Sequence, residues 1–346
     1  MNRPAKICII RLSAIGDVCN CIPTLRALQK EWPEAKVTWI VGKIEHSIVR
    51  DIEGVSFIVF DKTRFLREIF RLYNLLKGQE FDVLLQMQAS LRSSFLSLAV
   101  RAVRKIGFDE GRSKDFQTFF SNERIDSDER VHMVDTFLDF ARKAGVRYAP
   151  PEWRLATNRM KTELDGLSLR LPERFYIVSP CSSKPIRNWG AERYAAVVQA
   201  IWKKYGIICL ITGGNSRLEL EYGEIIQQDC VKGVINLAGK TTLRQLMALL
   251  EQAVYVIAPD SGPAHMAAAV GTPVIGLYAN TNPDRARSYD SRELVVNRYP
   301  QALEKYYNKS ANEAPWGTRV RVAGVMNLIT VDDVMEKVDR VVNLLE

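Results

Sequence analysis

The chain has 346 residues, of which 47% are apolar and 25% are charged, and its formal net charge is +8. This length is too great for one compact core, so the sequence predicts two domains of an ordinary globular protein with an anionic partner. No apolar run reaches the roughly 18 residues of a membrane span, and we expect no signal peptide because the N-terminus leads straight into a strand.

Apolar strand-like segments alternate with helical segments along the chain. In the first series they occupy residues 7–10, 36–41, 56–60 and 83–86. The second series occupies residues 175–178, 207–212, 233–237, 254–258 and 273–277. This alternation predicts two doubly wound α/β domains with parallel sheets, which bind ligands at the carboxyl ends of their strands.

A stretch with three prolines and no strand periodicity, residues 146–174, separates the two series. We therefore expect an N-terminal domain over residues 1–170 and a C-terminal domain over residues 171–330. Residues 331–346 form a further helix, capped by Thr330, with valines along one face. The polar segment 299–324 is left without a predicted place in the fold.

The six cysteines lie mostly in apolar, strand-like runs and form no CxxC pair. This pattern is typical of reduced thiols in the core of a cytoplasmic protein.

The loop after the first strand reads Arg-Leu-Ser-Ala-Ile-Gly-Asp and ends in Asp17, at the predicted start of a helix. Exposed N–H groups and the helix dipole stabilise an anion there. One interpretation is that Asp17 simply caps the helix. The other is that its carboxylate accepts a proton from a substrate hydroxyl.

Hydroxyl and cationic side chains follow the strand at 175–178: Ser182, Ser183, Lys184 and Arg187. These groups all donate hydrogen bonds, as a phosphate or pyrophosphate requires. A polar turn with solvated cations is the alternative.

The strand at 254–258 leads into Asp260, Ser261 and Gly262, with His265 in the first turn of the next helix. Gly262 allows close backbone approach, and the helix start presents N–H groups to an anion. The alternative is a well-capped core helix.

Carboxylates after the strand at 207–212 are candidates to accept hydrogen bonds from a ribose, although exposed Glu at a helix start is common. Asp126-Ser127-Asp128 resembles the DxD element of metal-dependent sugar transferases, but no strand precedes it. The three histidines lack metal-ligand spacing. We therefore predict no metal site.

Residues 62–105 carry nine Lys or Arg against three acidic residues, with apolar side chains interleaved over 64–77. This segment is either a core helix with a solvated face or a surface for an anionic, lipid-linked partner.

Two long segments, "IIRLSAIGDVCNCIPTLRAL" and "APDSGPAHMAAAVGTPVIGLY", resemble the opening and donor-site signatures of glycosyltransferase family 9, the heptosyltransferases of lipopolysaccharide core assembly. "TNPDRARSY" and "MNLITVDDV" match in place and order, so the resemblance covers essentially the whole chain. Within the family, "WIVGKIEHSIV", "FIVFDK" and "WGTRVR" are most similar to the heptosyltransferase I type that acts on one phosphorylated Kdo.

The resemblance implies a GT-B fold, in which two Rossmann-like domains face a central cleft and the final helix returns to the first domain. It also implies transfer of L-glycero-D-manno-heptose from ADP-heptose to Kdo, with inversion and with neither metal nor cofactor. Asp17 is then the general base.

The resemblance also assigns donor-binding roles in the second domain. Ser182 and Ser183 match a hydroxyl pair that holds phosphate, and Arg187 stands where relatives often have Lys. Glu219, with Glu221 close behind, is the choice for the ribose, and the backbone at Thr241 for adenine. Asp260, Ser261, Gly262 and His265 match the donor loop.

For the acceptor, the resemblance implies Gln88 and Arg92, to which Arg64 and Arg67 add cationic groups. The partner is a Kdo-lipid A acceptor, and the enzyme is cytoplasmic and peripheral on the inner membrane, without nucleic acid. Two alternatives stay open: a family member that adds the second or third heptose, and a non-catalytic protein that binds nucleotides or nucleic acid.

Overall fold

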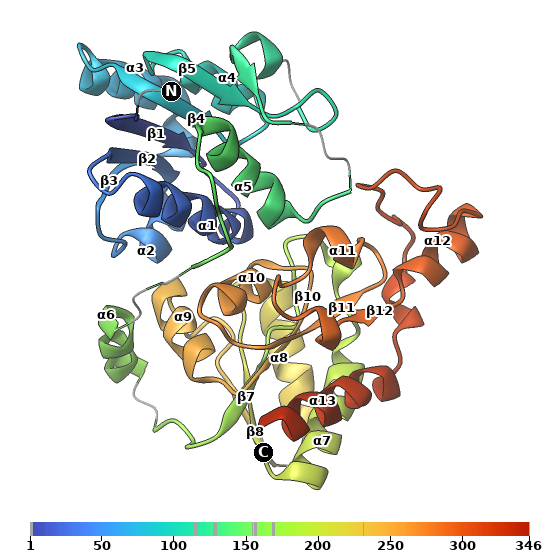
Figure 1. The fold of residues 1–346 in the computed structure, drawn as a ribbon. Helices are drawn as coiled ribbons and strands as arrows, with labels where there is room; N and C mark the ends of the chain where they lie inside the picture. The colour runs from blue at the N-terminus through green and yellow to red at the C-terminus, as the bar shows by residue number, and fades with distance from the viewer. Residues whose placement is uncertain are drawn as a thin grey trace. The chain divides into compact units, whose positions relative to one another are not determined.

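The computed structural model contains two units, Met1–Ala156 and Thr157–Glu346, each built on a six-stranded parallel sheet (Figure 1). The structure describes residues 3–113, 117–126, 130–153, 155, 158–167, 170–230 and 232–345.

The sheet of the first unit has the strand order β3-β2-β1-β4-β5-β6. Its strands are β1 (Lys6–Ile10), β2 (Lys36–Gly42), β3 (Val55–Phe60), β4 (Phe81–Gln86), β5 (Ala102–Gly107) and β6 (Glu123–Arg124). Its helices are α1 (Ile15–Glu31), α2 (Lys43–Val49), α3 (Phe65–Leu76), α4 (Leu91–Ser97) and α5 (Met133–Ala144).

The sheet of the second unit has the order β12-β11-β10-β7-β8-β9, which is the same topology. Its strands are β7 (Phe175–Val178), β8 (Ile208–Ile211), β9 (Val234–Asn236), β10 (Val256–Pro259), β11 (Val274–Tyr278) and β12 (Val296–Asn297). Its helices are α6 (Asn158–Lys161), α7 (Ala191–Tyr205), α8 (Arg217–Asp229), α9 (Leu243–Gln252), α10 (Gly262–Ala269), α11 (Pro283–Ala286), α12 (Tyr299–Tyr307) and α13 (Val331–Leu345).

The predicted strands all form, with ends that differ by up to two residues. A short apolar run between two helices is typical of a parallel strand that is buried on both faces. Sequence reasoning missed β5 and the two short strands β6 and β12, of which β5 is the longest. It carries Arg104 and Lys105, which made the segment look like solvated surface. Arg104 is instead paired with Glu123 of β6, so the charge stabilises the edge.

The domain boundary predicted at residue 170 lies too late in the chain. Helix α6 and the turn after it belong to the second unit. Met160 is fully buried, Lys161 pairs with Glu251 at 3.0 Å, and Arg244 pairs with Glu163. These contacts attach the segment to α9, which the polar composition of residues 158–167 did not indicate.

The prediction that the final helix returns to the first domain is wrong. Helix α13 lies beside α7 in the second unit (Figure 1). Its apolar face, with Val334 and Val338, is buried in the same core as Tyr194 of α7. The predicted cap is confirmed, since Thr330 Oγ1 accepts a hydrogen bond from Asp333 N at 3.1 Å.

The segment 299–324, which had no predicted place, folds onto the second unit. It begins with α12 and then returns to the end of β11, where Val320 N donates to Asn280 O at 2.9 Å. Asn280 Nδ2 donates to Val320 O at 2.6 Å. The segment therefore covers the loop that follows β11.

All six cysteines are free and buried, as predicted. Burial raises the pKa of the Cys19 thiol to about 12, so it stays protonated. None of the helices in the described part of the chain combines the length and apolar character that a membrane crossing requires.

Candidate active site

Both sheets have a topological switch point, where the direction of strand addition reverses. It lies between β1 and β4 in the first unit and between β7 and β10 in the second. In doubly wound sheets, the loops at the carboxyl ends of these central strands diverge and leave room for a ligand. Several predicted site residues lie in or just after these loops, namely Asp17 and Gln88 in the first unit and Ser182, Arg187 and Asp260 in the second.

Asp17 stands in the first turn of α1, where its carboxylate oxygen accepts a hydrogen bond from Ala14 N at 3.3 Å. The side chain is 37% exposed and forms an ion pair with Arg11. Asp17 thus caps the helix, as one interpretation proposed. It also keeps part of its carboxylate accessible, as the other interpretation requires.

Arg11 and Gln88 connect the loop of Asp17 to the loop after β4. Gln88 Oε1 accepts from Leu12 N at 2.7 Å and from Ser13 N at 3.2 Å. Arg11 Nη1 donates to Met87 O at 2.6 Å. Gln88, predicted to contact the acceptor, therefore uses its side-chain oxygen to hold the loop that carries Asp17.

Sequence reasoning missed two other residues of this network. Arg11 directly follows β1, a position that could have marked it. Gln117 is fully buried, and its Nε2 donates to Gln86 O at 2.9 Å and to Gln88 O at 3.2 Å. No local pattern marks Gln117, because its partners lie about thirty residues away.

A second missed pair lies at the ends of β2 and β3. The Glu45 side chain is buried, and its Oε1 lies 2.9 Å from Lys62 Nζ. Gly42 permits this arrangement, because a Cβ there would lie 2.3 Å from both Leu12 O and Glu45 Oε2. The pair thus borders the loop after β1.

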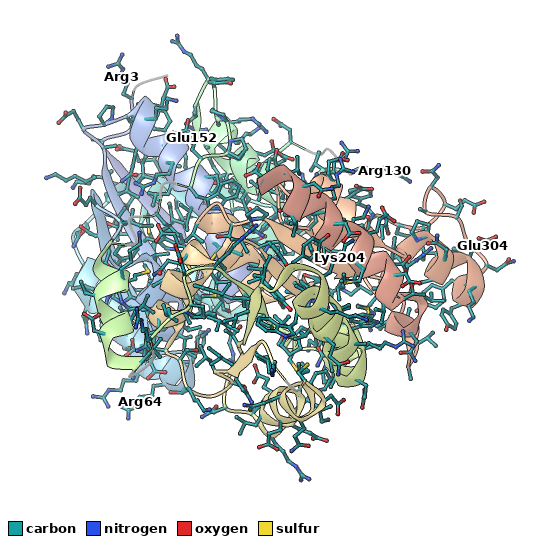
Figure 2. All side chains as sticks on the ribbon, turned by 90° about the horizontal axis from the view of Figure 1, so that it is seen from below. Arg3, Arg64, Arg130, Glu152, Lys204 and Glu304 are labelled. Atoms are coloured by element: carbon teal, nitrogen blue, oxygen red, sulfur yellow. The ribbon has the colours of Figure 1, made fainter. Side chains whose placement is uncertain are left out.

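The other predicted acceptor residues lie at the starts of two helices. Arg64 and Arg67 are exposed near the start of α3, and Arg64 projects away from the ribbon (Figure 2). Arg92, in α4, lies over the Phe65 ring, with its guanidinium carbon 5.9 Å from the ring centre. Among the described residues, no hydrogen bond or ion pair joins these arginines to Asp17.

In the second unit, Asp260 lies at the carboxyl end of β10 and is nearly buried. Arg187 Nη1 lies 3.1 Å from Asp260 Oδ2 and also donates to Asp260 O at 3.1 Å. His265 Nε2 lies 3.8 Å from Oδ1. Burial alone would raise the pKa of Asp260, but hydrogen bonds from His265 and Thr281 and the charge of Arg187 lower it overall.

Polar atoms around this loop are buried without a hydrogen-bond partner among the described residues. They include Ser261 Oγ and His265 Nδ1 at the start of α10, and Asn188 Nδ2 and Thr212 Oγ1 in the loops after β7 and β8. Buried polar groups are almost always paired in native proteins. Such atoms are therefore suited to the polar groups of a bound ligand.

The loop after β7 presents the two predicted serines differently. Ser182 Oγ accepts from Lys184 N at 3.1 Å and donates to Lys184 O at 2.9 Å, so its hydroxyl shapes the turn. Asn188 Oδ1, which sequence reasoning missed, accepts from Ser182 N at 2.8 Å. Ser183 is exposed at the tip.

Glu219, at the start of α8, accepts hydrogen bonds within its own loop, from Gly214 N at 2.8 Å and from the Ser216 hydroxyl. Its carboxylate has further acceptor capacity. Glu221 is exposed on the same helix. Thr241 directly precedes Thr242, which caps α9 by accepting a hydrogen bond from Gln245 N.

Within the described residues, no three or more His, Cys, Asp or Glu side chains gather in a way that would hold a metal ion. Of the DxD-like segment, Asp126 pairs with Lys143 at 3.0 Å. Ser127 and Asp128 lie outside the described residues.

The model of glycosyltransferase family 9 (heptosyltransferase) matches residues 69–316. The chain is 38% identical over 332 residues to the lipopolysaccharide core heptosyltransferase OpsX of Haemophilus influenzae, covering 96% of this chain and 95% of that protein. The chain belongs to glycosyltransferase family 9. The predictions of the family and of a glycosyltransferase are thereby confirmed.

Solved structures support the fold of this family 9 chain. The family 9 glycosyltransferase from Veillonella parvula has a TM-score of 0.79 at 19% identity, with 97% of each chain covered. Escherichia coli heptosyltransferase WaaC with ADP has a TM-score of 0.74 at 17% identity, covering 97% of this chain and 99% of that one. The predicted GT-B class, with two Rossmann-like sheets, is confirmed.

Proposed function

We propose that this chain transfers L-glycero-D-manno-heptose from ADP-heptose to a phosphorylated Kdo of the lipopolysaccharide inner core, with inversion and without a metal. The observation that carries the proposal is the 38% identity to the core heptosyltransferase OpsX over nearly both full lengths. The partly exposed carboxylate of Asp17 supplies the group that such a reaction needs.

Asp17 acts as the general base in this proposal. Its carboxylate takes the proton of the acceptor hydroxyl, whose oxygen attacks the anomeric carbon of the heptose while the bond to ADP breaks. Arg11 forms an ion pair with this carboxylate at the start of α1. Arg11 also fixes the direction of the carboxylate, because its guanidinium is anchored to Met87 O.

The second unit stabilises the negative charge that develops on the leaving ADP. Asp260 holds the guanidinium of Arg187 at the carboxyl end of β10. The N–H groups at the start of α10 follow closely in the chain. Ser183, and the unpartnered Ser261 Oγ and His265 Nδ1, supply further polar contacts. Fixed cationic and dipolar groups of this kind perform the task that a metal performs in other transferases.

The remaining donor contacts follow from the loops around β8 and α9. Glu219 accepts from the ribose hydroxyls, since its carboxylate is already oriented by Gly214 N. The backbone at Thr241, next to the start of α9, meets the adenine. Glu221 is the alternative for the ribose, because it is exposed on the same helix.

The acceptor is anchored in the inner leaflet of the inner membrane, so the enzyme works as a peripheral protein on the cytoplasmic face. Arg64, Arg67 and Arg92 bind the carboxylate and phosphate groups of Kdo. All three are exposed and lie at the starts of two neighbouring helices. Gln88 contributes by holding the loop of Asp17.

The deciding experiment incubates the purified protein with ADP-heptose and a panel of acceptors: lipid A carrying one phosphorylated Kdo, lipid A with two Kdo, and heptosyl-Kdo lipids. Mass spectrometry of the products should show one added heptose on the phosphorylated single-Kdo lipid. NMR of the product should show that the anomeric configuration has inverted.

Two outcomes would replace the proposal. Addition only to heptosyl-Kdo lipids would make the protein a later heptosyltransferase, a possibility that its 25% identity to lipopolysaccharide heptosyltransferase 3 of Escherichia coli keeps open. Tight ADP binding without transfer to any acceptor, or salt-sensitive binding of any polyanion, would favour a non-catalytic protein.

A further inference from the structure

Helices α3 and α4 cover the same face of the first sheet. Leu72 of α3 and Leu96 of α4 are buried in one core cluster with Ile10 and Leu84 of the central strands. The contact of Arg92 with the Phe65 ring joins the first turns of the two helices. Figure 1 shows both helices on the side of the sheet opposite α1 and α5.

Each of these helices also has an exposed apolar stripe on its outer side. In α3 the stripe consists of Leu66, Phe70 and Tyr73, which are 72%, 69% and 55% exposed. In and just after α4, Leu91, Phe95 and Leu98 are 45%, 45% and 59% exposed. Both stripes have the spacing i, i+4, i+7, so each set lies along one side of its helix.

This concentration of apolar surface is local. Most of the exposed large hydrophobic side chains of the described residues lie between Leu66 and Phe119. Single exposed apolar residues are ordinary, but a patch across two adjacent helices indicates a partner. Sequence reasoning anticipated an apolar element only at 64–77 and treated the α4 segment as a polar acceptor loop.

The charges around the stripes identify the partner. Arg64, Arg67, Lys77, Arg92 and Arg101 are exposed in and next to the two helices. The one acidic residue within α3 and α4, Glu68, is bonded to Arg71 at 2.7 Å. A surface that combines Phe, Leu and Tyr with unneutralised Arg and Lys is suited to a bilayer with anionic headgroups.

We propose that the outer faces of α3 and α4 together form a membrane-docking surface, whose two apolar stripes enter the headgroup region of an anionic bilayer. A second copy of the chain fits this surface poorly, because two such basic faces would repel each other. The inference rests on the proposed function, since a lipid-anchored acceptor places the enzyme at a bilayer. The surface can nevertheless be tested without any acceptor.

The first test uses vesicles of 70% phosphatidylethanolamine and 30% phosphatidylglycerol that contain no glycolipid. In a flotation assay, Leu66→Ser/Phe70→Ser and Phe95→Ser/Leu98→Ser should each weaken binding about tenfold or more, because partial burial of two large apolar side chains is lost. Ile44→Ser is the matched control, since Ile44 is 57% exposed in the same unit but lies on α2; it should bind like the wild type.

A second measurement does not depend on the stability of the serine variants. Because the six native cysteines are buried, a cysteine placed by Phe70→Cys or Phe95→Cys can be labelled selectively with an environment-sensitive fluorophore. Its emission should shift to shorter wavelength when vesicles are added, whereas a label at Ile44→Cys should not respond. The proposal would be overturned if the protein floats with vesicles but the emission of the labels at both positions does not shift.

Two further results would decide between this inference and the proposed function. The serine variants should keep wild-type turnover on a deacylated, water-soluble Kdo acceptor, whereas failure of the wild type on that acceptor would contradict the proposed chemistry alone. A dimer in solution that Leu66→Ser/Phe70→Ser dissociates would instead make this face a subunit interface, and the membrane proposal would be wrong.

Discussion

The two units share one sheet topology, and each has an aspartate beside the start of a helix at its switch point, yet the two carboxylates are built differently. Asp17 has one cationic partner and is 37% exposed. Asp260 is 12% exposed, and Arg187, His265 and Thr281 surround it. An exposed carboxylate can meet a substrate hydroxyl, whereas an enclosed one orients its neighbours. We therefore propose different roles for the two carboxylates on the basis of their exposure and partners, although their position and residue type are alike.

The sharpest test of this difference is Asp17→Asn. Asparagine keeps the size and capping ability of the side chain but cannot take the proton, so turnover should fall about a hundredfold or more. Steady-state kinetics with ADP-heptose would measure the loss, and calorimetry should show nearly unchanged ADP binding. Near-normal turnover would reduce Asp17 to a helix cap.

The acceptor role assigned to the first unit is tested by Arg64→Glu/Arg67→Glu. If each cation contributes roughly 1 kcal/mol near an anionic surface, the acceptor KM should rise about thirtyfold at low salt, and less at high salt. The affinity for ADP should not change, since the nucleotide is assigned to the second unit. Arg147→Glu, an exposed arginine beyond α5, is the matched control. An unchanged KM would place acceptor binding elsewhere.

The enclosed carboxylate of the second unit is tested by Asp260→Asn. Loss of its charge leaves Arg187 poorly oriented, so ADP should bind about tenfold more weakly, and unfolding should become easier by about 2 kcal/mol. Because folding lowers the pKa of Asp260, its stabilising effect is present above its usual pKa of 3.8 and is lost as the pH falls further.

Thermal unfolding of the wild type and of Asp260→Asn at several pH values would check this sign. The difference in stability between the two proteins should be constant near neutral pH and should become smaller in acid. A stability difference that grows in acid, or tighter ADP binding by the variant, would contradict the orienting role of Asp260.

The last prediction is that removal of metal ions does not change turnover. If Arg187 and the start of α10 stabilise the leaving diphosphate, treatment with EDTA followed by assay in metal-free buffer should leave turnover unchanged. The control is the same assay with Mg²⁺ restored. A strict requirement for Mg²⁺ or Mn²⁺ would show that these groups do not suffice.

Several candidate site residues could be proposed from the sequence because their signals are local. Asp260 directly follows a buried strand, and Asp17 lies in the first turn of the helix that follows another, so a short motif determines which groups reach the sheet edge. Glu219 was predictable as a candidate, but its bonds to Gly214 and Ser216 were not. The bracing role of Gln88 was missed because its backbone partners, Leu12 and Ser13, lie 76 and 75 residues earlier in the chain.

By itself, the sequence determined the parallel α/β character of both units, the positions of most strands along the chain and the two strand-to-helix loops, because apolar periodicity and strand-end motifs act over a few residues. The order of the strands within each sheet came only from the structure. Only the tertiary structure decided that α13 packs on α7, that Asp17 is exposed and Asp260 enclosed, and that α3 and α4 present neighbouring apolar stripes. Each of these depends on which distant segments meet, and a stripe of valines or leucines is equally stable against any apolar surface that covers it.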